Sequence, residues 1–269
     1  RVATLVAPGP SPTEVSRVVA DEVRRLLGVE DAGVCRYEPD GTGVLVVGLG
    51  PNIRKSAPRW ALAADREAID TVLDGREFRR GKLRITYTGG RGPLGSEAAY
   101  GAPTLLVALA PAEVAAPLAS IVTAPWTRNE RGALAGVKST SYAENVRTLG
   151  YAAEREANEA IFLNTAGHVC EGTGTNVFMV FGDTVVTPPL SAGPLAGITR
   201  ELIMEWGTVE QGDLTLEEAK RADEVFITSS MRDVQGVERW DEQTFSPAHR
   251  VTRAVAVNFA ERSEADLDP

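Results

Sequence analysis

The residue type best suited to covalent chemistry in this chain is Lys138, which lies where an apolar run meets a polar one in LAGVKSTSYAENV. Lysine is rare here: the others are Lys55, Lys82 and Lys220, and arginine supplies the remaining basic side chains. A lysine amine can lose its proton and act as a nucleophile, whereas a guanidinium stays protonated. The sequence therefore suggests a nucleophilic Lys138, with chance placement as the alternative.

A carboxylate and two anion-binding elements follow later in the chain. Glu171 opens the polar stretch EGTGTN, where it could face a ring nitrogen or lie in a surface turn. In LAGITREL, Gly197, Ile198 and Thr199 fall at a predicted helix N-terminus, whose N–H groups and dipole favour anions. ITSSMRD, residues 227–233, adds hydroxyl groups at a predicted strand end. Each feature alone is more typical of structure, but together they match the aldehyde, pyridine nitrogen and phosphate of pyridoxal phosphate.

Other motifs favour structural interpretations. GRGPLG, residues 90–95, matches G-x-G-x-x-G, but Pro93 and the Gly-Ala-Pro that follows predict a loop rather than the helix of a dinucleotide site. His168, Cys170 and Glu171 lie close together, but no second pair of cysteines or histidines supports a metal site. A Ser-His-Asp triad is disfavoured because no G-x-S-x-G elbow is present.

Composition limits the class of partner. The 269 residues are 43% hydrophobic, enough for one large domain or two medium ones, and the formal net charge is −9. A negative chain is not expected to bind nucleic acid or anionic membranes in general. No run approaches about 18 apolar residues, no signal peptide is visible, and two cysteines do not make a disulfide framework. We therefore expect a cytoplasmic protein without nucleic-acid or membrane partners.

Hydrophobic periodicity predicts mixed helices and strands without strict alternation, which favours an α+β fold or a barrel-like mixed sheet. A hairpin is expected around Pro39-Asp40-Gly41, and Thr215 precedes Glu218 at capping-box spacing. Three short strands are expected in EAIFLNTAG and TNVFMVFGDTVVTPP, and one in EVFITSS. GITRELIMEWG is a further helix. The other expected helices cover residues 12–28, 60–73, 141–157 and 247–262, and the other expected strands cover residues 82–88, 102–110 and 119–126.

Four blocks give the chain a resemblance to a known family: KSTSYAENV, NEAIFLNTAGHVCEGTGTNVFMV, TPPLSAGPLAGITREL and ADEVFITSSMRDV, in that order. They resemble the fold-type IV pyridoxal-phosphate enzymes, which include branched-chain aminotransferases, D-amino-acid aminotransferases and 4-amino-4-deoxychorismate lyases. In its detailed sequence, the chain is most similar to the lyases. The resemblance covers roughly residues 60–269 and implies an α+β fold with a large, mixed, β-barrel-like C-terminal domain, for which we set the boundaries 59–269.

The resemblance assigns roles around the cofactor ring. Lys138 would bind the cofactor aldehyde covalently and later act as general base and acid. Tyr142 would hydrogen-bond the phenolic oxygen, Glu171 would face the ring nitrogen, and Leu195 would pack on the ring.

The phosphate would contact the N-terminus of the helix that begins near Gly197. Ile198 and Thr199 would supply contacts there, and Ser230 would add a third.

The first fifty residues differ from the family's usual opening and instead resemble the first helix and hairpin of a GAF domain. We therefore treat residues 1–58 as an atypical small N-terminal α/β segment, as in a chimera. The family's phosphate-binding arginine has no clear counterpart, and Arg54 and Arg59 are the candidates.

The function that the resemblance implies is a lyase that converts aminodeoxychorismate to pyruvate and 4-aminobenzoate. A transaminase of branched-chain or D-amino acids is the alternative, and a chimeric scaffold with impaired or no catalysis is the second. A homodimer with a small-molecule amino substrate is implied in either enzymatic case.

Overall fold

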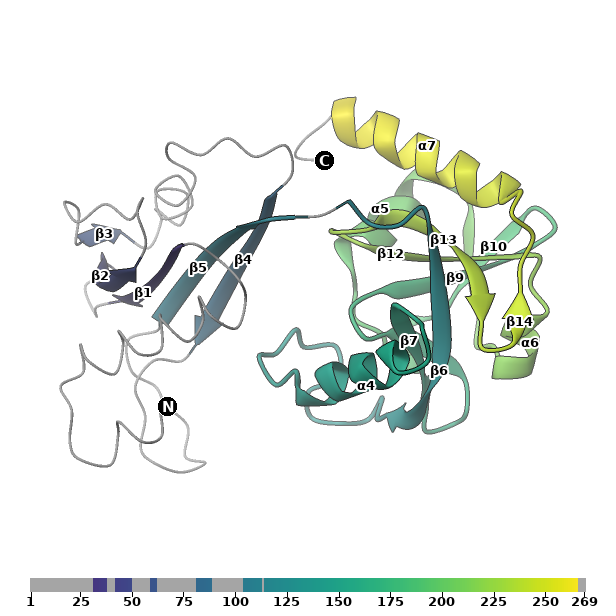
Figure 1. The fold of residues 1–269 in the computed structure, drawn as a ribbon, viewed down its shortest axis with the longest axis horizontal. Helices are drawn as coiled ribbons and strands as arrows, with labels where there is room; N and C mark the ends of the chain where they lie inside the picture. Colours follow the sequence, from purple (N-terminus) through teal and green to yellow (C-terminus); the bar gives the residue numbers. More distant parts are fainter. Residues whose placement is uncertain are drawn as a thin grey trace. The chain divides into compact units, whose positions relative to one another are not determined.

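The computed structural model describes residues 31–37, 42–49, 59–61, 81–88, 104–112 and 114–265, and the chain divides into two compact units, Arg1–Val114 and Ala115–Pro269 (Figure 1). The predicted helix at 12–28 and the turn Pro39-Asp40-Gly41 lie outside these residues. Of the helix predicted at 60–73, only Trp60 and Ala61 are described, and they belong to a strand, so the predicted start is wrong. The boundary expected after residue 58 rests on sequence resemblance and stays a prediction.

The first unit contains a five-stranded antiparallel sheet among its described residues, in the order β3-β2-β1-β5-β4. The predicted hairpin is confirmed, because β1 and β2 pair with Ala32 opposite Leu49. β5 pairs with both β1 and β4, so the hairpin shares one sheet with the strand predicted at 82–88. The strands are β1 (Asp31–Tyr37), β2 (Thr42–Leu49), β3 (Arg59–Ala61), β4 (Gly81–Thr88) and β5 (Thr104–Pro111).

The second unit is built on a mixed sheet that curls without closing, in the order β11-β10-β9-β12-β13-β6-β7-β8, with β14 paired to β13, among the described residues (Figure 1). Its strands are β6 (Leu118–Arg128), β7 (Glu159–Asn164), β8 (Val169–Gly172), β9 (Asn176–Phe181), β10 (Thr184–Thr187), β11 (Val209–Gln211), β12 (Glu224–Ser229), β13 (Asp233–Trp240) and β14 (Gln243–Thr244). Strands and helices are mixed without strict alternation, so the expected α+β class is confirmed. The segment 159–187 contains four strands rather than three, and the additional strand, β8, carries Glu171.

The helices of this unit are α4 (Ala143–Ala153), α5 (Ile198–Trp206), α6 (Leu216–Lys220) and α7 (Arg250–Ala265), with a 3₁₀ turn, η2 (Leu190–Ala192). The capping box predicted from Thr215 and Glu218 is present at α6. α7 starts and ends three residues later than expected, because the Glu224 carboxylate accepts hydrogen bonds from the N–H groups of Val251 and Thr252 and so caps its first turn.

Two cores lie on opposite faces of the curled sheet, which explains why β9 reads as a continuous apolar run. Val177 and Met179 point to one face and join a cluster that includes α6. Phe178 and Val180 point to the other face, where α5 and α7 pack. Alternate residues of β9 thus pack into the cores on both faces of the sheet.

β6 is an interior strand of this sheet and pairs in parallel with both β13 and β7. Its ladder with β7 skips two residues, since Thr123 lies opposite Ile161 but Thr127 lies opposite Leu163. Pro125, which has no N–H to donate, falls inside this bulge. Such bulges bend a strand and redirect the side chains beyond them, and here the side chain beyond is Arg128.

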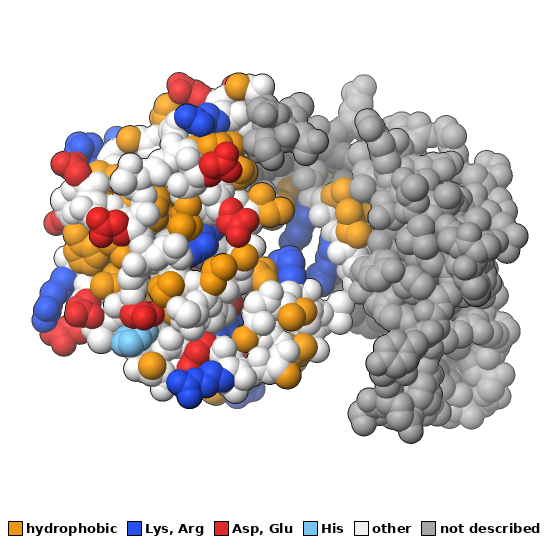
Figure 2. All heavy atoms as spheres, turned by 180° about the vertical axis from the view of Figure 1, so that it is seen from behind, with side chains coloured by type: hydrophobic (Ala, Val, Ile, Leu, Met, Phe, Trp, Pro, Cys, Tyr) orange, Lys and Arg blue, Asp and Glu red, His pale blue; other side chains and the backbone are white. Residues whose placement is uncertain are grey.

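The surface and helices say little about partners. Figure 2 shows acidic and basic side chains interspersed over the visible described face of the second unit. No helix within the described part of the chain has both the length and the apolar character needed to cross a bilayer.

Candidate cofactor-binding and active site

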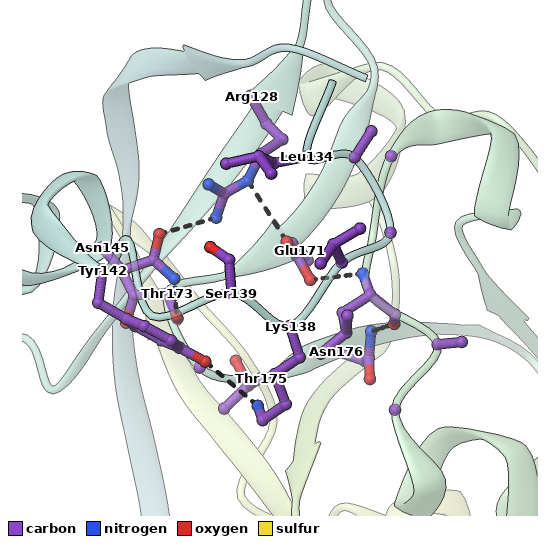
Figure 3. A pocket seen from close by; sticks show the side chains of 18 of the residues that line it. Arg128, Leu134, Lys138, Ser139, Tyr142, Asn145, Glu171, Thr173, Thr175 and Asn176 are labelled. Atoms are coloured by element: carbon purple, nitrogen blue, oxygen red, sulfur yellow. Dashed lines mark hydrogen bonds and ion pairs between the residues drawn. The ribbon is translucent and has the colours of Figure 1, made fainter. Parts of the chain in front are cut away.

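One cavity of about 740 Å³ opens in the second unit where four segments meet (Figure 3). The segments are the chain from the end of β6 to α4, the β8–β9 loop, the entry to α5 and the end of β12. All the site residues expected from the sequence line this cavity: Lys138, Tyr142, Glu171, Leu195, Gly197, Ile198, Thr199 and Ser230. The fold therefore brings together segments that lie far apart in the sequence, although their roles are proposals.

Lys138 lies on an exposed loop just before α4, and its Nζ donates a hydrogen bond to Tyr142 Oη over 3.2 Å (Figure 3). Tyr142 occupies the N-cap position of α4, but its side chain makes no capping bond and instead reaches the lysine. The four-residue spacing of this pair is thus set by the turn that starts the helix. The pair places an amine and a phenol at the same side of the cavity.

Glu171 lies across the cavity in β8, with its side chain 14% exposed. Its Oε2 accepts a hydrogen bond of 2.8 Å from the Leu195 N–H. Burial raises the pKa of the Glu171 carboxyl, while the Leu195 hydrogen bond and the positive charges of Arg128 and Lys138 oppose that rise. A cationic ring nitrogen beside this carboxyl would favour its ionised form, so the group suits the role that the resemblance gave it.

The loop after Glu171 is shaped by a buried acid that sequence reasoning did not identify. Glu159, at the start of β7, accepts hydrogen bonds from the Thr173 N–H, the Thr173 hydroxyl and the Thr175 hydroxyl. A Cβ at Gly172 would lie 2.1 Å from Thr175 Oγ1, so only glycine fits the turn. The sequence signal that could have identified Glu159 is its position as a charged residue at the start of the otherwise apolar strand EAIFLN.

The entry to α5 forms a cradle for an anion. Gly197 is the N-cap and offers no side-chain cap, and the first N–H groups of a helix have no partner within it. A Cβ on Gly197 would lie 2.1 Å from Asn176 Oδ1, so the close approach of β9 requires glycine. Ile198 is 72% exposed and Thr199 is buried, so contacts from Ile198 to an anion would come from its backbone.

A phosphate would also find hydroxyl groups at the end of β12, where Ser230 is exposed. Thr228 Oγ1 is buried beside the same cavity without a hydrogen-bond partner in the described structure. An orphaned buried hydroxyl and a glycine cradle fit a phosphate, and the amine and carboxyl across the cavity fit the aldehyde and pyridine nitrogen. The residues present therefore fit pyridoxal phosphate.

Arg128, at the end of β6, is the main site residue that the sequence did not reveal. Its Nε lies 3.3 Å from Glu171 Oε1 and its Nη2 donates to Asn145 Oδ1 at 3.1 Å (Figure 3). Its Nη1 pairs with Glu144. The strand expected at 119–126 ends before it, and the bulge in β6 changes which way the strand end faces.

The remaining candidates do not join the site. Cys170 points away from Glu171 into the core, where burial raises the pKa of its thiol. Within the described ranges no cluster of three or more His, Cys, Asp or Glu could hold a metal. Arg54 and the side chain of Arg59 lie outside the described residues, so the phosphate arginine stays a prediction.

Comparison with known proteins decides the family. A model of the family described as Amino-transferase class IV matches residues 57–240. The chain belongs to the class IV aminotransferase family. The enzymes of this family depend on pyridoxal phosphate, in agreement with the donor set in the cavity.

Relatives of this class IV aminotransferase-family chain include both expected activities. It is 36% identical over 121 residues to branched-chain-amino-acid aminotransferase 6 of Arabidopsis thaliana, covering 42% of this chain and 34% of the relative. It is 30% identical over 134 residues to the aminodeoxychorismate lyase of Vibrio harveyi, covering 47% and 49%. The matches with the first curated relatives span between 34% and 62% of their lengths.

The fold is shared with solved structures. The branched-chain aminotransferase of Thermoproteus uzoniensis superposes with a TM-score of 0.67 at 20% identity and covers 91% of this chain and 88% of its own. The class IV aminotransferase fold, with its curled mixed sheet, is therefore confirmed. The comparisons give no support to a GAF-like origin of residues 1–50.

Proposed function

We propose that this chain is a pyridoxal-phosphate-dependent 4-amino-4-deoxychorismate lyase, which releases pyruvate and 4-aminobenzoate. The observation that carries the proposal is the single cavity that combines the Lys138 amine, the Glu171 carboxyl and the N-terminus of α5. The lyase is supported by the sequence resemblance and by the Vibrio harveyi relative. The branched-chain aminotransferase relatives support transamination as the alternative.

Each side chain would have a distinct task. Bound pyridoxal phosphate supplies an aldehyde for amines and a ring that accepts an electron pair. Lys138 would attach the cofactor through Nζ and, once displaced by the substrate amine, would move the proton at the substrate Cα. Tyr142 would orient Lys138, Glu171 would hold the ring nitrogen protonated, and the α5 N–H groups would bind the phosphate.

The first test is the attachment point. The purified protein is incubated with pyridoxal phosphate, reduced with borohydride, digested and mapped by mass spectrometry, and we expect the label on Lys138. The variant Lys138→Arg keeps the charge but cannot be trapped, so it serves as the control. A label on Lys55, Lys82 or Lys220 instead would contradict the assignment, and no trapped cofactor would support the non-catalytic scaffold.

The second test separates the two enzymatic activities. We expect pyruvate and 4-aminobenzoate from aminodeoxychorismate without an added keto acid. If product forms only from pairs of an amino acid and 2-oxoglutarate, the transaminase assignment replaces the lyase assignment. This test is needed because both reactions would use the same lysine, so the labelling experiment cannot separate them.

We also propose that the chain acts in the cytoplasm and forms a homodimer. The dimer is proposed because apolar side chains around the cavity are exposed. Leu134 and Val137 are each 56% exposed, and Val146 and Leu149 on α4 are 67% and 43% exposed. A second copy of the chain would cover such side chains. Sedimentation at micromolar concentration should show a dimer, and Val146→Asp should shift it toward monomer. A wild-type monomer would refute this part of the proposal.

A further inference from the structure

The guanidinium of Arg128 is held by four groups of this chain, of which Figure 3 shows Glu171 and Asn145. Its Cζ atom lies 4.1 Å from the centre of the buried Phe162 ring. Its three nitrogens face different partners: Nε faces Glu171, Nη1 faces Glu144, and Nη2 donates to Asn145. The side chain is only 18% exposed, so these contacts fix its orientation.

The contact with Glu171 has an unusual geometry. Arg128 Nε lies 3.3 Å from Glu171 Oε1, which is within ion-pair distance, but its N–H is not aligned to donate and has no other hydrogen-bond partner. A buried donor without a partner costs free energy. The guanidinium therefore acts on Glu171 through its charge rather than through an Nε hydrogen bond.

Other charges also act on Glu171. Lys138 lies on the opposite side of the cavity and favours the ionised carboxylate, whereas the buried Glu159 disfavours it. The Leu195 N–H fixes Oε2 from the α5 side. Of the two cations, only Arg128 is held rigidly, because Lys138 is exposed and would be engaged by cofactor in the proposed function.

Glu144 modulates this arrangement, because it binds the far side of the same guanidinium. It is 47% exposed and competes with Glu171 for the Arg128 charge. Asn145 completes the link, since its Oδ1 accepts from Arg128 and its Nδ2 donates to the Thr173 carbonyl at 2.5 Å. The first turn of α4 is thus connected through Arg128 to the loop that follows Glu171.

We propose that Arg128 is a positioning residue that keeps Glu171 ionised and oriented toward the cavity, and that Glu144 sets the strength of this effect. The effect on Glu171 follows from contacts within the chain. Its consequence for the cofactor's ring nitrogen rests on the proposed function. A purely structural role, in which Arg128 only ties β6 to α4, is the competing explanation.

The primary experiment is a carboxyl titration by ¹³C NMR on cofactor-free protein with labelled glutamate, with the Glu171 signal assigned by its loss in Glu171→Gln. In Arg128→Met the Glu171 midpoint should move to higher pH, and in Arg128→Lys it should stay nearer the wild type. In Glu144→Gln it should move to lower pH, because the competing charge is removed. Arg155→Met is the matched control: Arg155 also stacks on an aromatic ring, at 3.5 Å from Tyr151, but does not line the cavity.

An unchanged Glu171 midpoint in folded Arg128→Met overturns the proposal in favour of the structural role. If Arg128→Met does not fold, the decision passes to Glu144→Gln, where an unmoved or raised midpoint overturns it equally.

A second readout is the dissociation constant of pyridoxal phosphate, measured by fluorescence quenching. We expect Arg128→Met to weaken binding by about tenfold, with a loss that grows as the pH falls toward the raised midpoint. A wild-type protein that does not bind the cofactor would reject the proposed function alone, whereas wild-type-like binding by Arg128→Met would reject only the role of Arg128 toward the cofactor.

Discussion

Glu171 illustrates how one residue acquires a function from its surroundings. The sequence offered a glutamate before a Gly-Thr turn, and the fold adds the Leu195 N–H, the Arg128 charge and partial burial. Residue types were therefore predictable at the site, because Lys138, Glu171 and Gly197 are unusual in their local context. Arg128 and Glu159 were not, because their relevance depends on contacts made across strands.

We predict that Glu171→Gln retains cofactor but loses most of the turnover. The amide can still accept from the Leu195 N–H, but it cannot stabilise a protonated ring nitrogen, which should raise the barrier by about 3 kcal/mol or more. Steady-state kinetics at saturating cofactor measure the effect. If Glu171 were an ordinary turn residue, rates would match the wild type and stability would change by about 0.5 kcal/mol at most.

The same substitution should stabilise the cofactor-free protein. Burial raises the Glu171 pKa in the folded state, so its contribution is fully present at low pH and is lost as pH rises through the folded-state pKa. Glu171→Gln removes that loss, so denaturant unfolding should show a gain at neutral pH that disappears below about pH 4. A destabilised variant at neutral pH would mean that the charged carboxylate is well compensated.

At the scale of elements, patterns within one segment were predictable and departures from regularity were not. The capping box at α6 and the helix that begins after Gly197 follow from local spacing, and both are present. The bulge around Pro125 cannot be predicted from the hydrophobic pattern of the strand, because it is defined by the pairing of β6 with β7. The start of α7 likewise depends on Glu224, which comes from another strand.

We predict that Gly197→Ala impairs the α5 cradle. The added Cβ would lie 2.1 Å from Asn176 Oδ1, so either Asn176 must move and lose its bond to the Leu195 carbonyl, or α5 must shift. Such overpacking should cost roughly 1–3 kcal/mol in unfolding free energy and weaken pyridoxal phosphate binding. The control is Gly150→Ala in α4, where a Cβ meets nothing within 4 Å and stability should rise by up to about 1 kcal/mol. Equal behaviour of the two variants would remove the steric argument.

Across the whole molecule, stability should depend on pH through His249. This side chain is 2% exposed, and neither ring nitrogen has a hydrogen-bond partner within the described residues. Burial lowers the His249 pKa, with Glu224 opposing and Arg253 assisting. The unfolded chain then binds the proton more readily, so stability is fully present above about pH 6.5 and falls as pH drops toward the folded-state pKa.

The variant His249→Asn removes the titrating group and tolerates the left-handed backbone at this position, where φ is 42°. Chemical denaturation from pH 8 to 5 should show a smaller acid-induced loss of stability in this variant than in the wild type. Parallel curves for the wild type and His249→Asn would assign the pH dependence to other groups.

The order of strands could not be read from the sequence, although the class of fold could. One of the two parallel partners of β6 is β13, which lies far from it along the chain, and Ser120 bonds to Glu238 across 118 residues of sequence. Local patterns specify which segments form strands, but this pairing depends on the packing of the complete unit.

The pairing of β6 with β13 also bears on the order in which the protein is made. β6, which ends at Arg128, leaves the ribosome long before β13, which begins at Asp233, so its partner on one side is missing during most of translation. Pairing of such distant segments is slow because a long loop must close first. The amine and the carboxyl are therefore synthesised early, but their common cavity can take its final form only near the end. Nascent chains arrested before β13 should fail to capture cofactor, and chains extended past Trp240 should acquire that ability.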